Sequence, residues 1–166
     1  MIKTKILRIK PKWLLSQSYN LFDDHGKKVC EIIYPLKHYL MKMNVAYLII
    51  DNKKHQIVDA IHHATLIGES KPVNTYIEID GKKIIEIEYT YLGSNEKFNV
   101  SYEEMRFHVE LKGYGKHEIS HNKQIIGVLK NKGIFLRRST MKFDIEIPVL
   151  VQAMIFWASI NQQEIR

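Results

Sequence analysis

Residues 149–160 read VLVQAMIFWASI, and every residue in this stretch except Gln152 and Ser159 is apolar. In a helix, these side chains point in nearly every direction around the axis, which is the pattern of a helix buried on all sides. Such a helix extends about 18 Å at 1.5 Å per residue, whereas a bilayer span needs roughly 20 apolar residues. The stretch therefore predicts a buried core helix over residues 148–161, and not a transmembrane helix.

The remainder of the chain consists of short segments with strand-like alternation, separated by turn residues. Asp80-Gly81 is the strongest hairpin signal, and residues 51–54 (Asp-Asn-Lys-Lys) predict a polar turn. The expected strands cover residues 28–34, 40–50, 56–62, 74–79, 82–91, 97–102, 106–111, 116–120, 124–129, 134–138 and 141–147, with two more within residues 1–22. No second helix is expected, so strands must cover the apolar one.

The last expected strand, residues 141–147, has the clearest alternation in the chain. Its charged face consists of Lys142, Asp144 and Glu146. Its apolar face, which should point to the core, consists of Met141, Phe143, Ile145 and Ile147. Pro148 then ends the strand and suits the first turn of a helix.

About a dozen strands and one apolar helix predict a mainly β protein, an antiparallel closed barrel of roughly twelve strands around the buried C-terminal helix. A barrel of eight strands is filled by its own side chains, and a larger one needs something inside. The helix supplies that filling. A β-sandwich with the helix capping one end is the alternative, and we favour the barrel. No linker divides the chain, so residues 1–166 should form one domain.

Three stretches carry a family resemblance: LFDDHGKKV (residues 21–29), HEISHNKQIIGVLKNK (117–132) and FDIEIP (143–148). They resemble the early hairpin, the late hairpin and the last strand of the tubby C-terminal-like superfamily, which includes the plant LURP-one-related proteins and small bacterial relatives. The resemblance follows the whole chain in order. It implies a twelve-stranded barrel threaded by a hydrophobic C-terminal helix. Because tubby domains bind phosphoinositides, it also implies binding of anionic lipid headgroups.

The sequence contains no motif typical of an enzyme or a cofactor site. Glu103-Glu104 reads as a solvated pair in a turn rather than an acid–base couple. His117 and His121 would lie on one face of a strand about 13 Å apart, too far to share a metal ion. Cys30, the single cysteine, reads as a small buried side chain on a strand. We therefore expect no catalysis, no cofactor and no bound metal.

The N-terminal segment and the single cysteine suit a cytoplasmic protein. Residues 1–10 are interrupted by charge every two or three residues and lack the continuous apolar region of a signal peptide. One cysteine cannot form an intramolecular disulfide, which suits a reducing compartment. We expect the cytoplasm, with peripheral contact to a membrane as the further hypothesis.

Charge is distributed unevenly along the chain, which carries a net charge of +7. Residues 1–22 and 119–143 contain several lysines and arginines and no acid, whereas residues 73–110 are rich in acid. A basic protein favours partners that carry phosphate. Only five of the 25 basic residues are arginine, the side chain that reads guanine edges, so sequence-specific nucleic-acid binding is disfavoured.

A binding role at an anionic surface follows if the barrel brings the two basic segments together. The candidate residues are Lys3, Lys5, Arg8, Lys130, Lys132, Arg137 and Arg138. Alternation prevents two adjacent strand residues from both facing outward, so either Arg137 or Arg138 should lie in a turn or at the barrel mouth. The alternatives are an ordinary mixed surface and a structural or protein-interaction barrel without a small ligand. The protein partner in that case is unknown.

Overall fold

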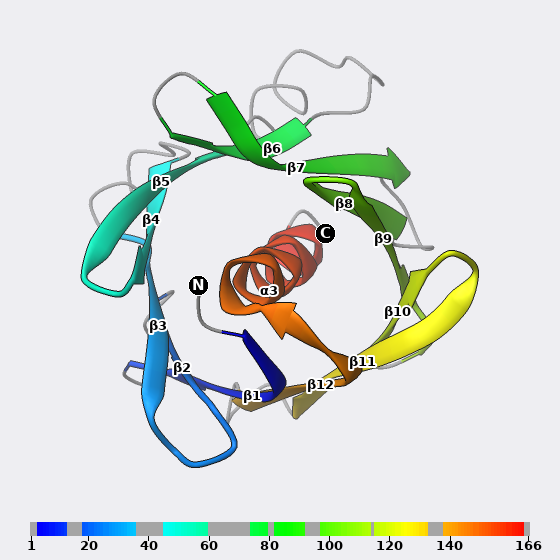
Figure 1. Cartoon of the computed structure of the whole chain (residues 1–166), viewed down its shortest axis with the longest axis horizontal. Coiled ribbons are helices and arrows are strands. Elements are labelled where there is room, and N and C mark those ends of the chain that lie inside the picture. Colours follow the sequence, from blue (N-terminus) through cyan, green and yellow to red (C-terminus); the bar gives the residue numbers. More distant parts are fainter. Residues whose placement is uncertain are drawn as a thin grey trace.

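Twelve strands in the described part of the chain close into an antiparallel barrel around a single helix (Figure 1). This computed structural model describes residues 3–12, 18–35, 45–59, 74–79, 82–91, 97–113, 115–132 and 138–164. The strands are β1 (Lys3–Pro11), β2 (Tyr19–Phe22), β3 (Lys28–Ile33), β4 (Val45–Ile50), β5 (Lys53–Asp59), β6 (Asn74–Ile79), β7 (Lys82–Tyr91), β8 (Lys97–Tyr102), β9 (Met105–Leu111), β10 (Lys116–His121), β11 (Gln124–Lys132) and β12 (Arg138–Pro148). The helix is α3 (Val149–Glu164). The predicted fold class is confirmed.

Each strand pairs with its neighbours in sequence, and β1 pairs with β12 to close the ring. Closure satisfies the backbone hydrogen bonds that an open sheet leaves unpaired at its edges. The turns at Asp51-Asn52 and Asn122-Lys123 have φ between 49° and 66°. A type I′ turn, common in two-residue hairpins, requires a positive φ at both of its central residues. The expected four-residue turn at 51–54 is therefore wrong. Two residues suffice to reverse the chain, and Lys53 and Lys54 begin β5.

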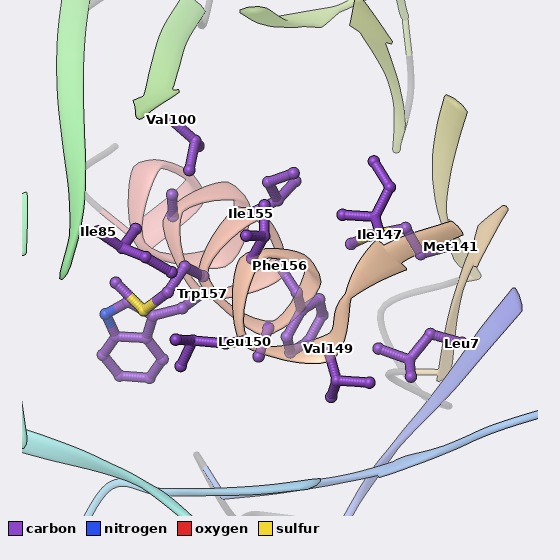
Figure 2. Packing of buried hydrophobic residues seen from close by; sticks show 14 of the residues in the cluster. Leu7, Ile85, Val100, Met141, Ile147, Val149, Leu150, Ile155, Phe156 and Trp157 are labelled. Carbon is purple, nitrogen blue, oxygen red and sulfur yellow. The ribbon is translucent and has the colours of Figure 1, made fainter. Parts of the chain in front are cut away.

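Helix α3 runs along the middle of the barrel and is buried from Val149 to Ser159. Its side chains extend outward in all directions toward the strands, where Leu7, Ile85, Val100 and Met141 also belong to the core (Figure 2). The predicted central helix is confirmed, and it continues three residues beyond the expected end at residue 161.

Two aromatic pairs fix the rotation of α3 against the first strands. Phe156 meets Tyr19 of β2 edge to face, with ring centroids 4.9 Å apart. Trp157 meets Tyr34, just after β3, at 5.5 Å in the same manner. Edge-to-face pairs are favourable beyond the area that they bury, so these contacts define one orientation of the helix.

The two polar residues of the buried helix find backbone partners. Gln152 Nε2 donates to the carbonyl oxygens of Thr4 and Ile147, each at 2.8 Å. Ser159 Oγ donates to the Ile155 carbonyl one turn earlier, also at 2.8 Å. Gln152 thereby joins the helix to β1 and to the end of β12, where the ladder between these strands is irregular.

The expectation that Ile145 faces the core is wrong, because this side chain is 44% exposed. The pairing of β12 with β11 ends at Phe143, opposite Gly127. On its other side, β12 shifts register against β1 beyond Lys142. The end of β12 then turns toward the barrel axis to enter α3 (Figure 1). Alternation predicts burial only where the ladder is regular, and Ile145 lies where β12 has separated from β11 and its register against β1 shifts.

Other expectations fall partly or wholly outside the described residues. Of the strand expected at 134–138, only Arg138 lies among the described residues, and it begins β12. The Asp80-Gly81 turn is also undescribed, although the flanking strands pair as expected, with Ile79 opposite Lys82. Cys30 is buried on β3, as predicted.

Candidate functional site

Five exposed basic side chains lie on three adjacent strands, β1, β12 and β11. We call this group the basic wall: Arg8, Lys10, Lys130, Arg138 and Lys142. The first two come from the acid-free N-terminal segment and the others from the second acid-free segment. Pairing of β1 with β12, and of β12 with β11, brings the two segments side by side. The juxtaposition thus follows from barrel closure.

Cross-strand register sets the spacing within the basic wall. Arg8 is opposite Thr140, and Thr140 is opposite Lys130, so these three residues form one row. Neighbouring strands are about 4.8 Å apart, which places the backbones of Arg8 and Lys130 roughly 10 Å from each other. Arg138 and Lys142 lie two residues to either side of the half-buried Thr140, and both are exposed on the same outer face.

No member of the basic wall forms an ion pair with another described residue. The ammonium of Lys10 lies over the ring of Phe22, 5.4 Å from its centroid. Like charges at this spacing repel one another, and exposure to water only weakens the repulsion. The wall therefore keeps positive charge that the described carboxylates do not compensate.

Glu31 on β3 shows how lysines outside the wall are used. Its carboxylate accepts hydrogen bonds from Lys12 and from Lys28, the latter at 3.1 Å. Burial by itself would raise the pKa of Glu31, but these two hydrogen bonds outweigh it and lower the pKa below its ordinary value. Lys12 follows β1 directly, yet its charge is compensated and adds little to the basic wall.

Strands β7 to β9, which carry much of the acid-rich segment, compensate their charges locally. Arg106 Nη2 lies 2.7 Å from Glu88 Oε2. Glu110 accepts hydrogen bonds from Lys112 at 2.7 Å and Lys97 at 3.0 Å, which lower its pKa to about 2. Strands β6 and β7 lie across the barrel from β1 and β12 (Figure 1). The ion pair between Arg106 and Glu88 of β7 therefore lies away from the basic wall.

The structure groups three of the predicted site residues, Arg8, Lys130 and Arg138, in the basic wall. Lys3 and Lys5 are also exposed, but they lie toward the opposite end of β1. They are separated from Arg8 by the register shift near Thr4 and Ile6 and do not join its row.

Two further candidates are only partly placed. Lys132 is opposite Arg138 in the backbone register of β11 and β12, but its side chain is not among those described. Arg137 lies outside the described residues. Arg138 is exposed at the first position of β12.

Two members of the basic wall, Lys10 and Lys142, were not among the predicted site residues. Alternation could have indicated both, because Lys10 is two residues from Arg8 and Lys142 is four residues from Arg138. What the sequence did not provide was the register between β1 and β12, which decides that these positions lie on one surface.

Polar groups on β8 to β10 form hydrogen bonds among themselves rather than a metal site. His108 Nδ1 lies 3.0 Å from Asn99 Oδ1, and Ser120 Oγ donates to the His108 carbonyl at 3.5 Å. His117 is fully buried, and His121 Nδ1 contacts the Arg106 carbonyl at 2.9 Å. Within the described ranges, no group of three or more His, Cys, Asp or Glu side chains is arranged to hold a metal ion.

Among the helices of the described residues, none combines the length and the apolar character needed to span a membrane. Comparison of the chain with family models, with curated proteins and with solved structures finds no match.

Proposed function

We propose that this protein is a binding module without enzymatic activity, and that its basic wall binds anionic lipid headgroups at a membrane surface. The observation that carries the proposal is the grouping of five exposed basic side chains without a described carboxylate partner on three adjacent strands. Elsewhere on the barrel, carboxylates do form ion pairs with basic side chains, as Glu88 and Glu110 show.

The electrostatics of a membrane suit such a wall. Each lysine or arginine close to an anionic leaflet contributes about 1 kcal/mol, and the attraction decays over roughly 8–10 Å at moderate ionic strength. The five charges lie within a few strand spacings, so several can approach the leaflet together. The resemblance to the tubby C-terminal-like superfamily points to the same class of ligand.

Sedimentation with vesicles tests the proposal. The unmodified protein should bind vesicles of phosphatidylcholine containing phosphatidylserine or a phosphoinositide, and not vesicles of phosphatidylcholine alone. Added salt should weaken binding. The double variant Arg8→Glu/Lys130→Glu should lose more than about tenfold in affinity, because two favourable contributions of about 1 kcal/mol become repulsive.

The matched control is Lys53→Glu/Lys82→Glu, which makes the same change of net charge at two exposed lysines on β5 and β7. Its affinity should stay close to that of the unmodified protein. Equal losses in both double variants would mean that diffuse net charge, and not the basic wall, drives binding. No binding to any anionic vesicle would favour a protein-interaction barrel instead.

A further inference from the structure

Two large apolar side chains are exposed in the described part of the barrel, Ile125 at 58% and Ile145 at 44%. Exposed isoleucines are individually common, but these two come from adjacent strands, β11 and β12. Each lies two residues beyond Gly127↔Phe143, the last pair of the ladder between these strands. Both side chains are therefore within two residues of the same backbone pair, at the point where β12 separates from β11.

This apolar pair lies on the same two strands as three members of the basic wall, Lys130, Arg138 and Lys142. Lys142 lies three residues before Ile145, and Lys130 lies five residues after Ile125. At about 3.3 Å per residue, the backbones of Ile125 and Lys130 are roughly 16 Å apart. One flat surface as large as a membrane can approach both features, whereas a single soluble headgroup spans only the charged part.

We propose that Ile125 and Ile145 form an apolar contact that enters the headgroup region of a bilayer when the basic wall binds it, an inference that rests on the proposed function. Surface attachment with one weak signal is readily reversible, and a second signal of another kind stabilises it. The basic wall supplies the electrostatic signal, and the isoleucine pair supplies the apolar one. The ligand is then an intact anionic bilayer rather than a free phosphorylated headgroup.

Charged neighbours limit how deeply the pair can enter. Asp144 and Glu146 flank Ile145 and are exposed, and Lys123 lies in the turn before Ile125. Carboxylates resist transfer out of water, so they hold the strand at the interface. The contact is therefore shallow, and it adds to the electrostatic attraction without replacing it.

The test compares two probes, vesicles of phosphatidylcholine and phosphatidylserine, and the soluble polyanion inositol hexakisphosphate. Ile125→Ser/Ile145→Ser should reduce vesicle affinity about tenfold, since two half-exposed isoleucines lose part of the 1.5–3 kcal/mol that full burial contributes. Its affinity for inositol hexakisphosphate should not change. Ile125→Leu/Ile145→Leu should bind vesicles as the unmodified protein does. Ile49→Ser, on β4, is the control for loss of an apolar side chain elsewhere on the barrel.

A second measurement reports insertion directly and does not depend on affinity. An environment-sensitive fluorophore attached at Ile125→Cys should shift to the blue on binding anionic vesicles. Cys30 is buried, and burial raises the pKa of its thiol, so the label should react at the new cysteine. A label at Lys53→Cys should not shift.

The outcomes separate the two proposals. Vesicle binding that survives Ile125→Ser/Ile145→Ser but is lost in Arg8→Glu/Lys130→Glu would overturn the apolar contact and leave the basic wall standing. Equal loss of vesicles and of inositol hexakisphosphate in the isoleucine variant would also overturn it, because the effect would then not be specific to a bilayer. If the unmodified protein binds neither probe, both proposals fail.

Discussion

At the scale of single residues, Phe156 shows how strongly the fold depends on its central helix. The side chain is 1% exposed and meets Tyr19 edge to face. Phe156→Ala should lower the free energy of unfolding by about 3–5 kcal/mol through lost burial and a residual cavity. Lys53→Ala, at an exposed position, should change it by no more than about 0.5 kcal/mol. Urea unfolding of both variants measures the difference, and similar midpoints would contradict the central position of Phe156.

Gly127 is required by a close approach and not by its backbone conformation. A Cβ at this position would lie 2.4 Å from Cδ1 of Phe143 and 2.8 Å from the carbonyl oxygen of Lys142. Gly127→Ala should therefore destabilise the barrel by about 1–3 kcal/mol, as overpacking of a core does. Thermal unfolding measures this loss. In the Phe143→Leu background the same change should cost less, so additive losses would show that the Phe143 ring is not the obstacle.

At the scale of secondary structure elements, Gln152 connects α3 to the two strands that close the barrel. Its amide donates to the carbonyl oxygens of Thr4 and Ile147, two residues that face each other in this irregular part of the ladder. Gln152→Leu should cost about 1–3 kcal/mol for each buried carbonyl left without a donor.

Ser159 is the matched comparison for Gln152, because it is equally buried but bonds only within its own helix. Ser159→Ala should change stability much less, since the Ile155 carbonyl belongs to a continuous helix. Chemical denaturation of both variants compares the two contributions. A loss for Ser159→Ala as large as that for Gln152→Leu would mean that the connection to β1 and β12 is not what matters.

The elements differ in how far the sequence reveals them. The helix was predictable because burial on all sides leaves no polar face, and β6, β7 and β8 were predictable to the residue because each is a short alternating run. The end of β12 was not, since Ile145 has the right alternation but lies where the strand leaves its partner. Alternation describes one strand, whereas the separation of β12 from β11 depends on the neighbouring strands and on the path into α3.

At the scale of the whole molecule, closure of the barrel is what creates the candidate site. Arg8 and Lys130 are more than a hundred positions apart in sequence, yet they lie on one row because β12 pairs with both of their strands. The sequence predicted two basic segments, and it predicted a ring in which they could meet. It could not separate Lys3, which lies toward the far end of β1, from Arg8, because that distinction depends on a register shift within one strand pair.

The charge distribution of the molecule also predicts how stability responds to acid. Hydrogen bonds from Lys112 and then Lys97 lower the pKa of Glu110 from 4.5 to about 2. A carboxyl whose pKa is lower in the folded state stabilises the fold above its unfolded pKa, and this contribution is lost as the pH falls toward the folded value. The lowered pKa of Glu31 acts in the same direction. Stability should therefore decline between about pH 4.5 and pH 2.

Urea midpoints measured across this acid range should separate Glu110 from the other carboxylates. Glu110→Gln removes the titrating group, so its stability should already be lower at neutral pH and should fall less steeply than that of the unmodified protein as the pH drops. Glu104→Gln, in the exposed turn between β8 and β9, is the matched control and should follow the unmodified protein. Parallel curves for Glu110→Gln and the unmodified protein would mean that the contacts with Lys97 and Lys112 do not contribute to folding, because only a group whose pKa differs between the folded and unfolded states makes stability depend on pH.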